Sequence, residues 1–183
     1  MTSVRGTLIN TKNNADLLKR VPHRSFLDLS VVYRFYYEGD MLLLVDNSIM
    51  EYKHLEEEKL FEMAMHDPKS IPIIYDAVEG FKMHGPKEFM YLMSNQDATF
   101  GAFSIISGKG ALRDFSEKIG RDIVLLPSSI HEWILVPADI SANPDQLSCI
   151  IQQVNQEQVP GGEVLSDHPY IYWRDTDEIT FFE

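Results

Sequence analysis

The chain has 183 residues, of which 44% are hydrophobic and 24% charged, and its formal net charge is −12. This length and composition are typical of a globular domain with a sizeable core, and they exclude a disordered chain, a collagen-like chain and a coiled-coil rod. The excess of acidic residues disfavours direct binding of DNA or RNA, which requires clustered Lys and Arg. The one cysteine, Cys149, excludes an internal disulfide and a cysteine-based zinc site.

The sequence predicts neither a signal peptide nor a membrane-spanning segment. Its first residues, MTSVRGTLINTKNN, contain no apolar stretch of the kind found in a signal peptide, and no run of 18 apolar residues occurs. A single cysteine also fits a reducing compartment. We therefore expect a cytoplasmic protein that does not span a membrane.

The first half of the chain is expected to hold strands and one helix. Alternating apolar and polar residues predict a strand at 4–10, and one or two helical turns are expected at 14–20. Residues 28–37 and 41–45 predict a hairpin around the turn Glu38-Gly39-Asp40. An amphipathic helix is then expected over 51–66, with Asn47 or Ser48 as its N-cap.

The second half begins with an expected irregular loop at 67–88, a stretch that contains three prolines and two glycines. The pattern then predicts two helices, 109–119 ended by Gly120 and 144–156 capped by Asn143. The expected strands are 89–94, 100–106, 122–126 and 132–137, with a polar loop at 127–131 and a closing hairpin of 170–173 and 178–182. Together these elements predict a single α+β domain over 1–183, with a mainly antiparallel sheet and about three helices.

One segment suggests nucleophilic chemistry, because Ser129, His131 and Glu132 lie close together in the sequence. No G-x-S-x-G elbow surrounds the serine, and neighbouring residues of a strand point to opposite faces. A turn whose polar side chains bind backbone groups is the favoured interpretation.

A second pair, Asp167 and His168, would complete a metal-dependent nuclease or hydrolase site if the fold brought it to Ser129, His131 and Glu132. No H-E-x-x-H spacing supports that site, and an Asp-His-Pro sequence before a strand is typical of a turn. The sequence therefore predicts a non-enzymatic protein with no metal site and no cofactor.

Acidic charge is concentrated at the end of the chain. Residues 132–183 contain ten acidic side chains and one basic one, Arg174. Such a region is either a solvated face or a surface that meets a basic partner. The candidate partner-binding residues are Glu163, Asp167, Asp175, Asp177 and Glu178.

Several segments resemble an uncharacterised family of clostridial gut bacteria and their mobile elements, a domain of unknown function. The segments that carry this resemblance are residues 4–10, FLDL at 26–29, MYLMSN at 90–95, FSEKIG at 115–120, LLPSSIHE at 125–132 and VLSDH at 164–168. The resemblance spans most of the chain and implies no activity.

Small acidic proteins of mobile elements are similar in type to inhibitors of type II CRISPR nucleases, which hold guide and target in a basic channel. The expected function is that of a phage- or plasmid-encoded anti-CRISPR protein. It would bind the effector nuclease with its guide RNA and block target DNA binding or cleavage. A host accessory binding module and a metal-dependent nuclease or hydrolase remain the alternatives, and the sequence leaves the oligomeric state open.

Overall fold

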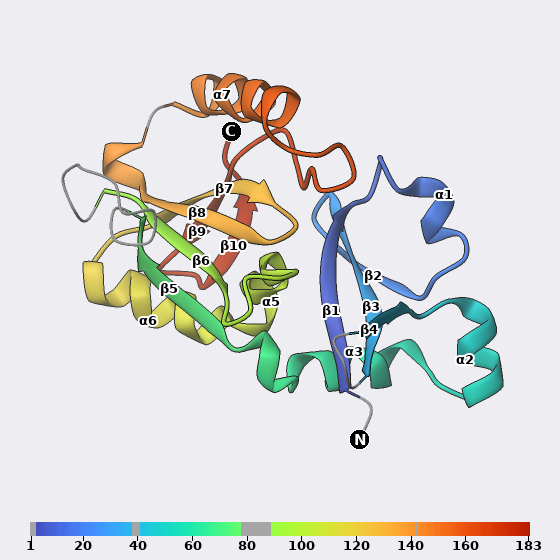
Figure 1. Cartoon of the computed structure of the whole chain (residues 1–183). Helices are drawn as coiled ribbons and strands as arrows, with labels where there is room; N and C mark the ends of the chain where they lie inside the picture. Colours follow the sequence, from blue (N-terminus) through green and yellow to red (C-terminus); the bar gives the residue numbers. More distant parts are fainter. Residues whose placement is uncertain (1–2, 38–40, 78–88, 142) are drawn as a thin grey trace.

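The computed structural model describes residues 3–37, 41–77, 89–141 and 143–183, and it confirms the α+β class (Figure 1). The strands are antiparallel throughout, but they form two sheets instead of one continuous sheet. The expected turn at 38–40 lies outside the described residues.

The first sheet is built by the first third of the chain. Its strands are β1 (Ser3–Asn10), β2 (His23–Phe26), β3 (Leu29–Tyr37) and β4 (Met41–Leu44), in the order β1-β3-β2 with β4 also paired to β3. Strand β2 was not expected, because its sequence HRSF lacks the apolar alternation of a half-buried strand. Pairing with β3 from His23↔Val32 to Phe26↔Leu29 stabilises it instead.

The second sheet has the strand order β10-β9-β7-β8-β6-β5. Its strands are β5 (Pro72–Asp76), β6 (Tyr91–Asn95), β7 (Ile123–Ser129), β8 (Glu132–Pro137), β9 (Tyr170–Trp173) and β10 (Glu178–Phe181). Strand β5 corrects the prediction of an irregular loop over 67–88. Residues 68–70 form the short helix η1 (Pro68–Ser70), β5 pairs with β6 along its whole length, and residues 78–88 lie outside the described part.

Two of the three expected helices are confirmed, namely α6 (Lys109–Ile119) and α7 (Pro144–Glu157). Gly120 ends α6 at a φ of 71°, and the Asn143 side chain accepts a hydrogen bond from Gln146 N at 2.9 Å. These are the terminal features that the sequence predicted. The described residues also include two one-turn helices, α1 (Ala15–Leu18) and α5 (Ser104–Ser107).

The helix expected over 51–66 is in fact two helices, α2 (Asn47–Lys53) and α3 (Glu57–Met65). His54 adopts a φ of 50° between them, a left-handed conformation that ends a helix. The N-cap prediction was also wrong by one residue, because Asp46 accepts the hydrogen bond from Ile49 N at 2.9 Å.

The strand expected at 100–106 is wrong. These residues form η2 (Gly101–Phe103) and α5, after Phe100 turns the chain at a φ of 54°. The indole Nε1 of buried Trp133 donates to Ala102 O at 2.8 Å, so this turn is held against β8. The polar loop predicted at 127–131 is shorter than expected, because β7 continues to Ser129.

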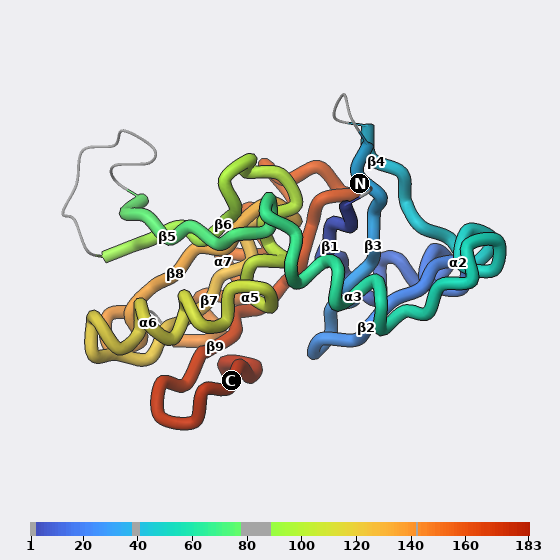
Figure 2. The backbone as a smooth tube through the Cα atoms, turned by 90° about the horizontal axis from the view of Figure 1, so that it is seen from below, coloured from blue at the N-terminus to red at the C-terminus, as the bar shows by residue number. Residues whose placement is uncertain are grey.

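One hydrophobic core joins the two sheets. Val4, Leu8 and Phe35 of the first sheet belong to the same buried cluster as Leu125 and Tyr172 of the second. Helix α3 contributes Leu60 and Ala64 to this cluster. Figure 2 shows α3 between the part of the molecule that holds the first sheet and the part that holds the second.

The second sheet is covered on both faces. Ile123 and Leu125 face the shared core together with Leu112 of α6. Val124, between them, packs instead with Leu147 of α7. Because side chains alternate along a strand, α6 and α7 must lie on opposite faces of the sheet, as Figure 1 shows.

None of the helices in the described ranges combines the length and apolar character needed to cross a lipid bilayer.

Candidate functional site

The carboxylate of Asp28 contacts three polar side chains where the first sheet meets the segment before β9. It lies in the turn between β2 and β3, where Leu27 adopts a φ of 53°. Its Oδ1 accepts a hydrogen bond from Tyr170 Oη at 2.6 Å. Its Oδ2 accepts one from Ser166 Oγ at 3.3 Å and lies 3.1 Å from His168 Nε2. This carboxylate therefore links the first sheet to the segment that leads into β9.

His168 is oriented by this contact. Its Nε2 faces the carboxylate of Asp28 at 3.1 Å, which holds the ring in place. Nδ1 has no hydrogen-bond partner in the described part of the chain. The ring also packs against Tyr170 and Phe181, with centroid distances of 5.1 and 5.0 Å. An imidazole held in one orientation with one free nitrogen is suited to accept a proton.

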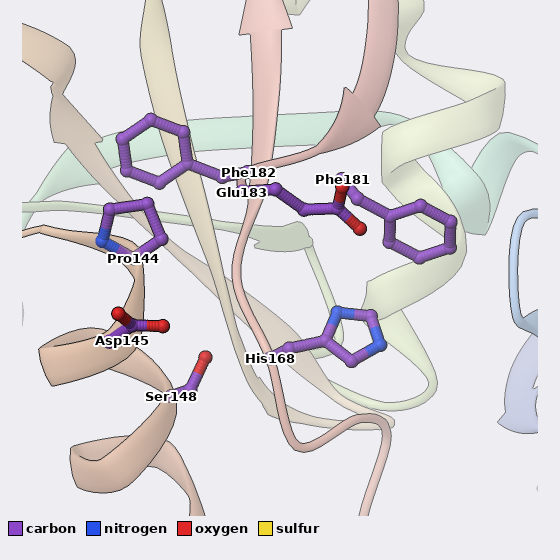
Figure 3. A pocket seen from close by; sticks show the side chains of 7 residues that line it. All are labelled: Pro144, Asp145, Ser148, His168, Phe181, Phe182 and Glu183. Carbon is purple, nitrogen blue, oxygen red and sulfur yellow. The ribbon is translucent and has the colours of Figure 1, made fainter.

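His168 also lines a cavity of about 410 Å³. Figure 3 shows His168 across this hollow from Asp145 and Ser148 of α7. The other lining residues are Pro144, Phe181, Phe182 and Glu183. The hollow thus combines aromatic walls with two carboxylates and one hydroxyl.

The hydroxyl of Tyr170 donates the hydrogen bond to Asp28 in this cluster. Burial raises the pKa of its hydroxyl, and the hydrogen bond to Asp28 raises it further. The hydroxyl therefore stays protonated at neutral pH and keeps donating to the carboxylate. The ring also packs edge-on against Trp133, with centroids 5.4 Å apart, so the cluster is tied to the shared core.

Asp167 does not join His168 at Asp28. Its Oδ1 accepts a hydrogen bond from Asn155 Nδ2 at 2.9 Å, and the same nitrogen donates to Ser166 O at 2.8 Å. Asn155 is buried on α7, so Asp167 helps to attach the segment before β9 to this helix.

His131 lies at the tip of the β7–β8 hairpin. Its Nδ1 accepts a hydrogen bond from Phe100 N at 3.0 Å, and the two rings stack at 5.6 Å. Its Nε2 lies 3.8 Å from a carboxylate oxygen of Glu163. This histidine holds the turn after β6 in place, as expected for a polar side chain that satisfies a backbone group.

Ser129 and Glu132 have comparable local contacts. Ser129 Oγ accepts a hydrogen bond from His131 N at 3.1 Å, and Ser128 Oγ donates to Glu132 at 3.4 Å. No interaction links these side chains to Asp167 or His168 within the described residues. Over the same ranges, no group of three His, Cys, Asp or Glu side chains is arranged to hold a metal ion.

The five acidic candidates differ in whether their carboxylates are paired within the fold or face solvent. Asp177 is bound internally, by Arg113, by Lys109 at 3.5 Å and by the Tyr172 hydroxyl at 2.8 Å. The hydrogen bonds from Arg113 and Tyr172 lower the pKa of its carboxyl. Asp177 therefore attaches the final hairpin to α6.

The remaining acidic candidates face solvent to different degrees. Asp175 is 84% exposed and pairs with its neighbour Arg174. Asp167 and Glu178 are also exposed, whereas the half-buried Glu163 faces His131.

One large aromatic side chain lies next to these carboxylates. Trp173 is opposite Glu178 in the β9–β10 pair and is 40% exposed. Phe181 is opposite Tyr170 and packs against His168, so it points to the other face of the hairpin. We call the surface formed by Trp173, Asp175 and Glu178 the hairpin surface. It is an exposed set of one large aromatic and two carboxylates.

A model of a family of unknown function, DUF5688, matches residues 2–174. The chain belongs to this family. The DUF5688 chain matches no curated protein and no solved structure. Two segments that carry the family resemblance in the sequence, 26–29 and 164–168, meet in space in this DUF5688 member through the contacts of Asp28 with Ser166 and His168.

The sequence pointed to His168 but not to Asp28 or Tyr170 as members of a site. The hydrogen bonds of Asp28 to Ser166 and Tyr170 bridge 138 and 142 positions of the chain, and no local pattern signals such a contact. The available signal was an acidic residue directly before strand β3, which is equally typical of a turn.

Proposed function

We propose that this chain is a non-enzymatic binding protein that docks its hairpin surface on a basic surface of another protein. The observation that carries the proposal is that exposed Trp173 lies beside the solvent-facing carboxylates Asp175 and Glu178 on the last hairpin. Aromatic side chains supply most of the buried area at protein interfaces, and charged rims set orientation and association rate.

The charge of the surrounding region supports a basic partner. Residues 132–183 carry ten acidic side chains against one basic residue. The one strongly neutralised candidate, Asp177, is held by Arg113 and Lys109 of α6, so its role is structural. The exposed carboxylates are available to attract Lys and Arg of a partner.

The partner that we propose is a type II CRISPR effector nuclease loaded with guide RNA. Such nucleases hold nucleic acid in a positively charged channel and read the motif beside the target with arginines. The resemblance in type to small acidic inhibitors supports this choice. In this proposal a phage or plasmid encodes the chain, which acts in the bacterial cytoplasm and blocks target DNA binding or cleavage.

A plasmid-cleavage assay tests this function. The purified protein is added in excess to several guide-loaded type II nucleases, either before or after the target DNA. We expect cleavage by at least one nuclease to be lost when the protein is added first. Protection that disappears once DNA is bound would identify DNA binding as the blocked step. Normal cleavage by every nuclease would contradict the proposal and favour a host accessory binding module.

A second candidate function rests on the Asp28–His168 pair. A carboxylate that orients an imidazole at the edge of a cavity is an arrangement found in hydrolases that use a general base. Ser148 lines the same cavity and is the hydroxyl that such a base would activate. This candidate needs no metal, unlike the composite site of Ser129, His131, Glu132, Asp167 and His168.

Turnover distinguishes the two candidates. Hydrolysis of an activated ester or an oligonucleotide should release product in excess over protein only if the chain is an enzyme. His168→Gln should then abolish product release without lowering the melting temperature, whereas His131→Ala should not. A chelator that stopped the reaction would instead favour the metal-dependent version.

A further inference from the structure

Two arginines share one face of the first sheet, on the side opposite the shared core. Arg5 of β1 and Arg34 of β3 are direct partners in the antiparallel register, so their side chains project from the same face. Arg5 is only 2% exposed. Burial also lowers the pKa of Arg34. Two neighbouring cations, one buried and one partly buried, are costly unless negative charge compensates them.

Carboxylates compensate only one of these arginines. Arg5 lies 3.6 Å from Asp67 and 3.2 Å from Asp97. Arg34 has no carboxylate partner within the described ranges, and its guanidinium instead lies over the ring of Phe100 at 4.4 Å. A cation–π contact leaves the hydrogen-bond donors of a guanidinium unsatisfied.

Unsatisfied polar atoms gather at the same place. Among the described residues, the buried atoms Arg5 Nε, Arg34 Nη1 and Thr7 Oγ1 have no hydrogen-bond partner. Thr7 lies two residues from Arg5 on β1, and therefore on the same face. Native proteins leave few buried donors unpaired, so a cluster of them indicates an acceptor that the chain itself does not supply.

One member of this cluster, Arg5, lines a cavity. The cavity has a volume of about 380 Å³, and its other lining residues are Tyr36, Leu42, Lys69, Asp97 and Thr99. The ammonium of Lys69 lies at its edge, 3.2 Å from Asp97 and 39% exposed. A ligand that entered here would meet Arg5 at the bottom and Lys69 at the opening.

We propose that this cavity binds a small oxyanion, the carboxylate or phosphate group of a metabolite or nucleotide. Arg5 and Lys69 would contact its oxygens, and Arg34 would supply the positive charge that no carboxylate neutralises. A planar guanidinium binds oxyanions with short charge-assisted hydrogen bonds, which a bound water cannot match. This site lies between the first sheet and the segments that carry Lys69, Asp97 and Thr99, and none of its lining residues belongs to the hairpin surface.

Anion titrations of the intact protein test the proposal. Millimolar phosphate and millimolar acetate are added separately at constant ionic strength, with chloride as the reference. We expect at least one of the two to raise the melting temperature, and the larger shift to identify the group that the site prefers. Isothermal titration with that anion should give a measurable dissociation constant.

Arg34→Met removes the uncompensated cation, and we expect it to weaken anion binding by about tenfold or more. Arg121→Met is the matched control, because Arg121 is an exposed arginine that pairs with Asp139 at 3.5 Å. Lys69→Met is a second test variant if Arg34→Met does not fold. Absence of an anion-specific shift in the unmodified protein would show that water alone fills the cavity. Equal shifts in Arg34→Met and Arg121→Met would likewise overturn the proposal.

Discussion

Asp28 is the residue that connects most of the candidate site. Its carboxylate accepts hydrogen bonds from Tyr170 and Ser166 and orients His168, so one side chain of the first sheet organises the entry to β9. Hydrogen bonds to a charged group contribute more to stability than those between neutral groups.

Removal of the Tyr170 hydroxyl measures the strength of this connection. Tyr170→Phe deletes the 2.6 Å hydrogen bond but preserves the packing of the ring. We expect the free energy of unfolding to fall by about 1–3 kcal/mol, measured by denaturant titration. Tyr52→Phe is the control, because Tyr52 is 84% exposed. If both variants were as stable as the original protein, Asp28 would not hold the two halves together.

Asp177 predicts how stability depends on pH. Arg113 and Tyr172 lower the pKa of its carboxyl in the folded state. The stabilisation is therefore present above the ordinary carboxyl pKa, about pH 4, and is lost as the pH falls through the lower folded value. Between pH 5 and pH 3, the denaturation midpoint of Asp177→Asn should fall less than that of the original protein.

Asp175→Asn is the matched control for this experiment, because Asp175 lies on the same hairpin but is 84% exposed. Its acid sensitivity should equal that of the original protein. Identical pH profiles for all three proteins would contradict the structural role assigned to Asp177.

At the scale of elements, β1 docks directly on η2. A Cβ atom at Gly6 would lie 2.6 Å from the ring of Phe103, and that ring is only 1% exposed. Because the surrounding core prevents the ring from moving aside, Gly6→Ala should destabilise the fold by about 1–3 kcal/mol.

Gly110→Ala is the control for that substitution. No atom lies within 4 Å of a Cβ at Gly110, which is in α6, so the substitution should be neutral or stabilising by about 0.5–1 kcal/mol. Thermal unfolding of both variants checks the pair. A Gly6→Ala protein that melts no earlier than Gly110→Ala would show that the contact with Phe103 is loose.

The sequence was informative for those elements whose period and terminal residues agree. Strand β1 follows an apolar–polar pattern over Val4–Leu8, α6 ends at a glycine, and α7 starts at an Asn-Pro pair, so all three could be predicted. The helix over 51–66 and the strand over 100–106 failed for a different reason. His54 and Phe100 each adopt a positive φ that glycine would normally signal, and tertiary contacts impose it instead.

The candidate site was only partly predictable. His168 stood out as a chemistry-bearing residue, whereas its orienting partner comes from the other end of the chain. The acidic region was visible in the sequence, but burial decided which carboxylates face solvent, and Asp177 proved to be an internal ion-pair partner.

At the scale of the whole molecule, one core carries two chemically different surfaces. The hairpin surface lies at the β10 edge of the second sheet, and the arginine cavity lies between the first sheet and the segments around Lys69 and Asp97. The shared hydrophobic cluster holds both sheets together, so the surfaces keep a fixed relation. The central claim is that the acidic hairpin surface binds a basic partner.

The most direct test of this claim is the affinity of two charge-reversed proteins for a guide-loaded type II nuclease at two salt concentrations. One carries Asp175→Lys and Glu178→Lys, and the other carries Asp16→Lys and Glu51→Lys at exposed positions in the first part of the chain. Both changes alter the net charge equally. We predict that the first protein binds about tenfold more weakly or worse and loses most of its salt dependence, while the second binds as the original does. Equal affinities for the two proteins would contradict the claim.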